Sequence, residues 1–337
     1  MKKQFLLFTM MLLCVFTAAA KIWRVNNNTG VVVDFSSIQA AHDGAADGDT
    51  IHLEPSINSY GDLGMSKRLV IISTGQFLSS NPGIQFDTKA PFLNTVNISN
   101  TGANNSVLMV RFAGNININS GVSGIALIGC ASTSANGNWN CTAGQVIINN
   151  ADNITVRGGW FSNIRFDNNA NNIVISNNIV GNAVANDASS DGIISNNVIH
   201  AIDGGPCGPN DGTINNCVVG NNIFNSQQNA TFFNCSVSNN IAPGANLPAG
   251  NGNLVNVDMS TVFVNSQGGF VDNVYQLKTG SPAIGAGGGG VDCGAFGGGS
   301  PFRLAVTPAI PSIYKMQLPA TPSGNSMTLT FSTKSNN

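Results

Sequence analysis

Residues Asn171–Val180 read NNIVISNNIV, so two pairs of asparagine flank a short apolar run. Nearly the same string returns at Ser190–Ile199, SDGIISNNVI. When these pairs are aligned, four repeats share an asparagine pair at positions 177–178, 196–197, 221–222 and 239–240, and a glycine pair at 158–159 fits the same column one repeat earlier. The residue five positions before each pair forms a second polar column: Asn153, Asn172, Asp191, Asn216 and Asn234. The repeats are therefore similar in length, except for a longer one that ends at the pair 221–222.

The four residues between the two columns alternate in polarity. The first and third positions are apolar or small, and the third reads Val156, Ile175, Ile194, Val219 and Val237. This period of two predicts a short strand with one buried face. Strands that recur every ~20 residues without a helical stretch between them indicate a solenoid of stacked parallel strands. Asparagine and glycine tolerate the left-handed backbone that sharp corners need, so the polar columns predict the corners of the coils.

The pattern resembles the right-handed parallel β-helix proteins of the pectate-lyase-like superfold. The segment 33–62, VDFSSIQAAHDGAADGDTIHLEPSINSYGD, is similar to their entry segment, with a short helix that caps the core and a first strand at Thr50–Leu53. Ser36 and Gln39 predict a capping box for this helix. The segment 275–298, YQLKTGSPAIGAGGGGVDCGAFGG, is similar to the closing segment of secreted bacterial members. The resemblance implies an all-β fold, and we expect a signal peptide at 1–20, a β-helix domain at 21–300 and an extended tail or cap at 301–337.

Composition and the amino end point to an exported protein. The chain begins MKKQFLLFTMMLLCVFTAAA, in which two lysines and an apolar run precede three alanines, as in a cleaved secretory signal. Cys14 follows leucine rather than a small residue, which argues against a lipoprotein signal. Only 9% of residues are charged and the net charge is −2, so no basic patch indicates a nucleic acid partner. No later stretch is long and apolar enough for a membrane span.

Candidate catalytic residues gather around one irregular repeat. This longest repeat carries the insertion DGGPCGPND at Asp203–Asp211, and loops on rigid solenoids often carry function. Asp187, His200, Asp203 and Asp211 are therefore the candidate catalytic residues for a polysaccharide lyase or glycoside hydrolase. Asp191 lies in a corner column whose other members are asparagine, which favours a structural role. The histidines have no ligand-like neighbours in sequence, so neither a metal site nor another cofactor is indicated.

Aromatic residues and cysteines give further expectations. Trp139 lies in the loop NGNWN and is the candidate sugar-stacking residue, whereas Trp160 aligns with core positions. Cys130 and Cys141 bracket the Trp139 loop and are predicted to form a disulfide. Cys217 and Cys235 occupy one inward column in neighbouring coils, where parallel side chains favour stacked thiols over a strained bond.

Three functions remain open from the sequence. The absence of a charged constellation favours a secreted or surface-attached, non-catalytic β-helix scaffold, for which a neutral polysaccharide is the candidate ligand. The second is a lyase or hydrolase with its site near the insertion at 203–211. The third is an adhesin, because Val174, Ile193 and Val218 predict an apolar stripe on the outer face. The oligomeric state is open.

Overall fold

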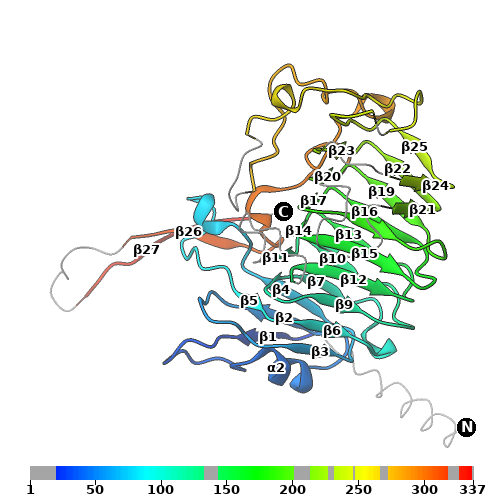
Figure 1. Ribbon diagram of the computed structural model, residues 1–337. Coiled ribbons are helices and arrows are strands. Elements are labelled where there is room, and N and C mark those ends of the chain that lie inside the picture. Colours follow the sequence, from blue (N-terminus) through cyan, green and yellow to red (C-terminus); the bar gives the residue numbers. More distant parts are fainter. Residues whose placement is uncertain are drawn as a thin grey trace, which may run out of the picture.

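The protein folds into a right-handed parallel β-helix, in which successive coils contribute short strands to three parallel sheets (Figure 1). The computed structural model describes residues 20–132, 143–200, 213–226, 231–245, 247–265, 272–317 and 326–335. Apart from residue 20, the predicted signal segment lies outside these residues.

Each sheet is built from strands that stack in sequence order. Sheet A has ten strands: β1 (Ile22–Val25), β2 (Thr50–Leu53), β4 (Val70–Ser73), β7 (Val107–Met109), β10 (Ala126–Ile128), β13 (Thr155–Arg157), β16 (Ile173–Ser176), β19 (Gly192–Ser195), β22 (Cys217–Gly220) and β25 (Ser236–Ser238). Sheet B has seven: β5 (Phe92–Leu93), β8 (Arg111–Phe112), β11 (Ala131–Ser132), β14 (Trp160–Phe161), β17 (Ile179–Val180), β20 (Val198–Ile199) and β23 (Ile223–Phe224). Sheet C has six: β3 (Leu63–Met65), β6 (Val96–Ile98), β9 (Ile116–Ile118), β12 (Gln145–Asn149), β15 (Asn163–Asp167) and β18 (Val184–Asn186). A separate pair, β21 (Thr213–Asn215) and β24 (Thr231–Phe233), follows β18 in the stack.

The predicted alignment of the repeats is confirmed by the pairing in sheet A. The residues predicted to point inward pair in register from strand to strand, and they are fully or almost fully buried. In stacking order they are Val156, Ile175, Ile194, Val219 and Val237. Because every coil adds such side chains to one continuous core, the buried columns stabilise the stack along its whole length.

The helix α2 (Ile38–Gly44) packs at the amino end of the stack against β1, β2 and β3, as predicted. Its N-cap is Ser37, whose Oγ accepts a hydrogen bond from the Ala40 amide, so the predicted capping box at Ser36 is wrong by one residue. His42 is buried on this helix, and its Nε2 accepts from the Ser66 amide at 3.0 Å. The described 3₁₀ turns are short: η1 (Leu78–Ser80), η2 (Thr101–Ala103), η4 (Met259–Thr261), η5 (Gly288–Gly290) and η6 (Leu304–Val306).

The exposed corner column is a partial hydrogen-bonded ladder. Asn172 Nδ2 donates to Asn153 Oδ1 at 2.7 Å, and Asn234 Nδ2 donates to Asn216 Oδ1 at 2.8 Å. These four asparagines have positive φ values between 51° and 58°, as corners require. Asp191 differs, because its φ is not positive, and its Oδ1 accepts from the Asn172 amide at 2.8 Å. Asp191 therefore closes a corner through its carboxylate rather than through its backbone conformation.

A second ladder runs inside the stack at the corner between sheets A and B. The second member of each asparagine pair is fully buried, and each Oδ1 accepts from a backbone amide of the preceding coil at 2.9 Å, in the order Asn178, Asn197, Asn222 and Asn240. Asn253 continues the ladder by accepting from the Asn240 amide. The first members, at Gly158, Asn177, Asn196, Asn221 and Asn239, all have positive φ. The repeated pairs thus combine a left-handed corner with a buried amide that links neighbouring coils.

The carboxyl-terminal part of the chain covers the outer side of sheet B (Figure 1). The outward residues Ala131, Trp160, Ile179, Val198 and Ile223 pack against residues of this later part. The later residues that meet them include Phe263, Tyr275 and Phe302. Trp160 is buried, as predicted, but it lies in this outer layer rather than inside the coils.

The predicted carboxyl-terminal tail runs along the β-helix first and ends in a pair of extended strands. Strands β26 (Ser312–Gln317) and β27 (Thr330–Lys334) form an antiparallel hairpin that projects from the side of the stack (Figure 1). Residues 299–311, called here the covering segment, do run along the β-helix. The alternation in SMTLTFST forms a two-stranded ribbon because it pairs with Ser312–Gln317 instead of with a coil.

The predicted disulfide between Cys130 and Cys141 is not supported at its described end. Cys130 is a free, fully buried thiol that lies just before β11, and its Sγ is 3.3 Å from the Leu108 carbonyl oxygen. Its side chain points into the core rather than toward the following loop, and burial raises the pKa of this thiol to about 12. Cys141 and Cys207 lie outside the described residues. Cys217 and Cys235 are free thiols in neighbouring coils, and the Cys217 amide donates to Cys235 Sγ at 3.4 Å.

Replacing Asp191 with asparagine is expected to change the free energy of unfolding by no more than about 0.5 kcal/mol. The amide oxygen of asparagine can accept the Asn172 N–H that Asp191 Oδ1 accepts now. Urea unfolding of Asp191→Asn, together with its glycan binding and hydrolysis, checks this expectation. A large loss of an activity on this isosteric change would instead assign Asp191 a catalytic role.

Candidate functional site

The two described candidate catalytic residues, Asp187 and His200, lie at different corners of the stack. Asp187 follows β18 at the corner that leads from sheet C to sheet A. Its carboxylate accepts from the Asn168 amide at 2.7 Å and from the hydroxyls of Ser189 and Ser190, both at 2.8 Å. Partial burial opposes ionisation, but these hydrogen bonds outweigh it and lower the pKa of Asp187. Asp187 is therefore an ionised group that fastens a corner.

His200 lies at the end of β20 in sheet B, at a different corner of its coil. Its Nδ1 is 3.0 Å from Asn225 Nδ2 and 3.3 Å from Tyr275 Oη. Burial lowers the pKa of His200 and raises that of Tyr275 to about 12, so both groups are neutral at pH 7. Asp203, Asp211 and Trp139 lie outside the described residues.

The predicted apolar stripe is present on the outer face of sheet A. Val174, Ile193 and Val218 are paired in register, and Ile193 and Val218 are 44% and 51% exposed. Beside them runs a column of Ser176, Ser195 and Gly220. In these coils sheet A therefore offers a flat surface without charge.

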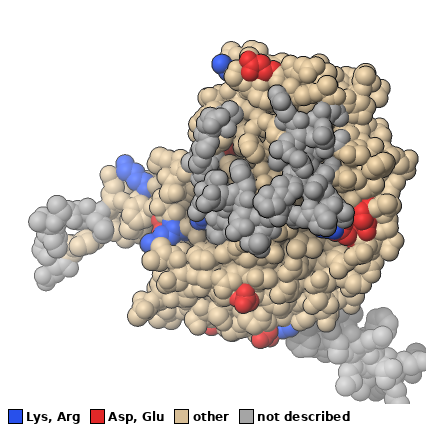
Figure 2. Space-filling view, in the orientation of Figure 1, with Lys and Arg blue, Asp and Glu red and all other residues tan. Residues whose placement is uncertain are grey.

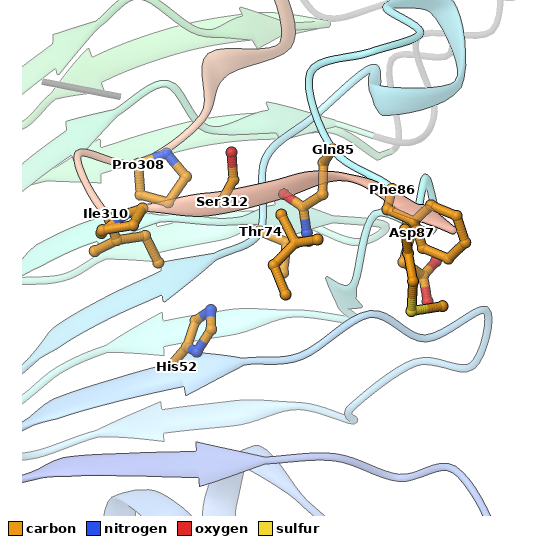
Figure 3. A pocket seen from close by; sticks show the side chains of 11 residues that line it. His52, Thr74, Gln85, Phe86, Asp87, Pro308, Ile310 and Ser312 are labelled. Atoms are coloured by element: carbon orange, nitrogen blue, oxygen red, sulfur yellow. The ribbon is translucent and has the colours of Figure 1, made fainter. Parts of the chain in front are cut away.

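A cavity of about 240 Å³ lies between the amino-terminal coils and the covering segment, and we call it the His52 cavity. Figure 3 shows His52 on β2 beneath Pro308 and Ile310, with Phe86 and Asp87 toward the far end. The described residues that line it come from three separate parts of the chain: His52 and Thr74, then Gln85, Phe86 and Asp87, then Pro308, Ile310, Pro311, Ser312, Ile313 and Met316.

Two polar groups of the His52 cavity have unused hydrogen-bonding capacity. Within the described structure, neither His52 Nε2 nor Thr74 Oγ1 has a hydrogen-bond partner, although both atoms are buried. Thr74 as a whole is only 6% exposed. Burial lowers the pKa of His52, so its imidazole is neutral at pH 7. Buried polar atoms are normally satisfied, so among the lining residues these two side chains have spare hydrogen-bonding capacity.

The opposite side of the His52 cavity combines an aromatic ring with a carboxylate. Phe86 is 50% exposed, and its backbone amide donates to the Ile313 carbonyl at 2.8 Å, which holds the backbone of this residue beside the hairpin. Asp87 accepts from the Lys89 amide and from Lys89 Nζ, at 3.1 Å and 3.2 Å. An apolar wall with a few convergent polar groups is the usual composition of a small-molecule site. Asp87 is the one carboxylate among the described lining residues, whereas most glycoside hydrolases need a pair.

His52 lies on the predicted strand Thr50–Leu53, which is β2 and not the first strand, because β1 at Ile22–Val25 precedes it. The sequence indicated no partners for His52. The candidate site residues predicted from the sequence do not include Thr74, Gln85, Phe86 or Asp87. They belong to the long segment 74–91 between β4 and β5, which interrupts the repeats as the insertion at 203–211 does. The same rule about irregular coils would have singled out this segment. The contribution of residues 308–316 comes from a distant part of the chain, and no local signal indicates it.

Charged groups are sparse on the surface around these features. Figure 2 shows lysine, arginine, aspartate and glutamate in a few separate groups on a largely uncharged face. Among the described residues, no helix is both long enough and apolar enough to cross a membrane. Comparison of the chain with family models, with curated proteins and with solved structures found no match.

Proposed function

We propose that this chain is an exported, non-catalytic β-helix protein that binds a glycan, with an uncharged sugar unit held in the His52 cavity. The observation that carries the proposal is the pair of unsatisfied buried atoms, His52 Nε2 and Thr74 Oγ1, opposite the exposed ring of Phe86. The resemblance to pectate-lyase-like proteins and the leader-like residues 1–20 support the proposed fold family and export.

In this proposal each lining group has a separate task. The neutral His52 and Thr74 exchange hydrogen bonds with sugar hydroxyls, since both side chains can donate and accept. The Phe86 ring packs against the apolar face of the sugar, as aromatic rings do against flat ligands. Asp87 accepts from hydroxyls at the rim. The rest of the β-helix is a rigid scaffold that holds the three segments in place.

A second candidate function is contact with another macromolecule through the stripe of Val174, Ile193 and Val218. The exposure of Ile193 and Val218 favours it, because neighbouring exposed apolar side chains often mark interaction sites. The enzymatic alternative near the insertion at 203–211 has less support, because Asp187 and His200 lie at different corners.

The test of the proposed function is a panel of neutral oligosaccharides measured by calorimetry, with the products assayed for new reducing ends and for unsaturated sugars. We expect saturable binding of at least one neutral oligosaccharide and no new products. New reducing ends or unsaturated sugars that depend on the protein would replace this proposal with the enzymatic one. Failure of every neutral glycan to bind would remove it.

Replacing Phe86 with alanine is expected to weaken binding of that oligosaccharide by up to about tenfold, because a stacked aromatic contact contributes roughly 0.5–1.5 kcal/mol. Thermal unfolding should change little, because the ring is half exposed. The matched control is Phe233→Ala, since Phe233 is 57% exposed on β24 and lies outside the cavity. Equal weakening by both variants would contradict the assignment of Phe86.

A further inference from the structure

A second cavity lies on the same face of sheet A, beneath the same covering segment. Its volume is about 350 Å³, and we call it the arginine cavity because Arg157 and Arg303 line it. Its floor comes from β7, β10 and β13 through Met109, Ile128 and Arg157. Its other described lining residues are Gly129, Gly158, Gly299, Ser300, Pro301, Val306, Thr307 and Ala309.

The two cavities adjoin each other along one column of outward side chains. In the register of sheet A, His52 pairs with Ile72, and Ile72 pairs with Met109. Further along the sheet, Ile128 pairs with Arg157. Four strand steps separate β2 from β13, which corresponds to roughly 19 Å. Thr307 and Ala309 line the arginine cavity, whereas Pro308 and Ile310 line the His52 cavity. Between residues 307 and 310, successive residues of the covering segment therefore line the two cavities in turn.

The charge of the arginine cavity is not balanced by the protein. None of its described lining residues is acidic, and in the described structure neither arginine forms an ion pair. Arg157 Nη1 makes a long contact of 3.4 Å with Ser300 Oγ, which leaves its other N–H groups for a ligand. Arg24 and Arg165, by contrast, are each paired with a carboxylate. In a chain with 9% charged residues, two unpaired guanidinium groups at one cavity are a marked concentration of positive charge.

The rest of the cavity suits a compact oxyanion. Ser300 and Thr307 supply hydroxyl groups, and a Cβ added at Gly158 or Gly299 would meet nothing within 4 Å, so the floor and wall are open there. Guanidinium groups bind carboxylate and sulfate through paired charge-assisted hydrogen bonds. A cavity lined by two arginines fits one anionic group, rather than the repeated charges of a polyanion.

We propose that the arginine cavity binds one carboxylate or sulfate group of the ligand, so that the glycan is neutral at the His52 cavity and carries an acidic substituent about four coils away. This inference rests on the proposed function for the identity of the ligand as a glycan. The anion site itself rests only on the geometry of Arg157, Arg303 and their neighbours.

The test uses three small probes on the full mature chain: glucose, glucuronate and glucose 6-sulfate, followed through the arginine Nε–Hε signals in NMR titrations. We expect saturable shifts of the Arg157 and Arg303 signals with at least one anionic probe, and none with glucose. The ratio of the two anionic affinities distinguishes carboxylate from sulfate recognition. No saturable response to either anion would overturn the proposal.

Two variants locate the site. Arg157→Gln should weaken anion binding about tenfold or more, because it removes a charge-assisted contact. Gly158→Asn should block the cavity while the fold is kept, since Gly158 has a φ of +64° and the equivalent corners at 177, 196, 221 and 239 are asparagine. The matched control is Arg165→Gln, because Arg165 lies on sheet C and is paired with Asp167. Unchanged anion binding in Arg157→Gln, or equal loss in Arg165→Gln, would contradict the site.

The same variants separate this inference from the proposed function. Arg157→Gln should still bind the neutral oligosaccharide, whereas Phe86→Ala should still bind the small anion. If the neutral glycan fails to bind but the anion response is lost in Arg157→Gln, the anion site stands and the proposed glycan function fails. If the neutral glycan binds and neither anion does, this inference fails alone.

Discussion

Asn197→Ala is expected to lower the free energy of unfolding by about 3–5 kcal/mol, because it leaves several buried polar groups without partners. Asn197 Nδ2 donates to the Ile175 carbonyl and to Asn222 Oδ1, both at 3.0 Å, and its Oδ1 accepts from the Asn178 amide at 2.9 Å. The side chain is fully buried, so water cannot replace these bonds. Urea unfolding monitored by circular dichroism measures the change.

The matched control is Asn172→Ala in the exposed corner column. Asn172 also bonds to an asparagine of the neighbouring coil, at 2.7 Å, but water reaches its amide. The positive φ of 56° adds a small cost for alanine, so we expect a loss of about 1–2 kcal/mol in total. Equal losses at the two positions would show that corner conformation, and not the buried ladder, determines the stability of the stack.

The coil architecture was predictable from the sequence because its signals are local and repeated. Each coil carries its own corner residues and its own inward pair of apolar or small residues, so five imperfect copies identify the register. The pairing of Val156 with Ile175, and of Ile175 with Ile194, demonstrates this register. The sequence did not distinguish the exposed corner column from the buried ladder. Both are columns of asparagine, and their burial depends on whether the side chain points into the coil.

The outer layer and the cavities were not predictable in this way. The neighbours of Trp160 include Phe77 and Tyr275, which lie far before and far after it in the chain. The His52 cavity likewise exists only because the covering segment returns to the first coils. A chain that folds back over a solenoid makes each contact once, so periodicity gives no indication of it. Cys130 shows a related error, since its spacing to Cys141 favoured a loop disulfide, whereas its thiol lies inside the core just before β11.

Asp272→Ala is expected to detach the covering segment and thereby weaken ligand binding in both cavities. Asp272 is 1% exposed, and its carboxylate accepts from Asn81 Nδ2, with both oxygens at 3.0 Å, and from the Ala305 amide. It thus joins the segment after β4 to the covering segment. Removing the acceptor leaves buried donors unpaired, at a cost of about 2–4 kcal/mol in local stability. Hydrogen exchange of residues 299–311 should become faster by at least an order of magnitude.

Two further variants separate the hydrogen bonds of Asp272 from its charge. Asp258→Ala is the matched control, because Asp258 is an exposed acceptor for the Ser260 amide and should leave exchange in residues 299–311 unchanged.

Asp272→Asn keeps an acceptor oxygen and removes the charge. Burial raises the pKa of Asp272, although hydrogen bonds from Ala305 and Asn81 oppose this effect. When the covering segment is attached, Asp272 therefore holds a proton that it releases on detachment. Attachment of the covering segment should weaken as pH rises from about 3.9, the ordinary pKa of aspartate, through the raised pKa of Asp272. Asp272→Asn should remove this part of the pH dependence. If attachment in the unchanged protein instead strengthens over this pH range, the hydrogen bonds, rather than burial, determine the pKa of Asp272.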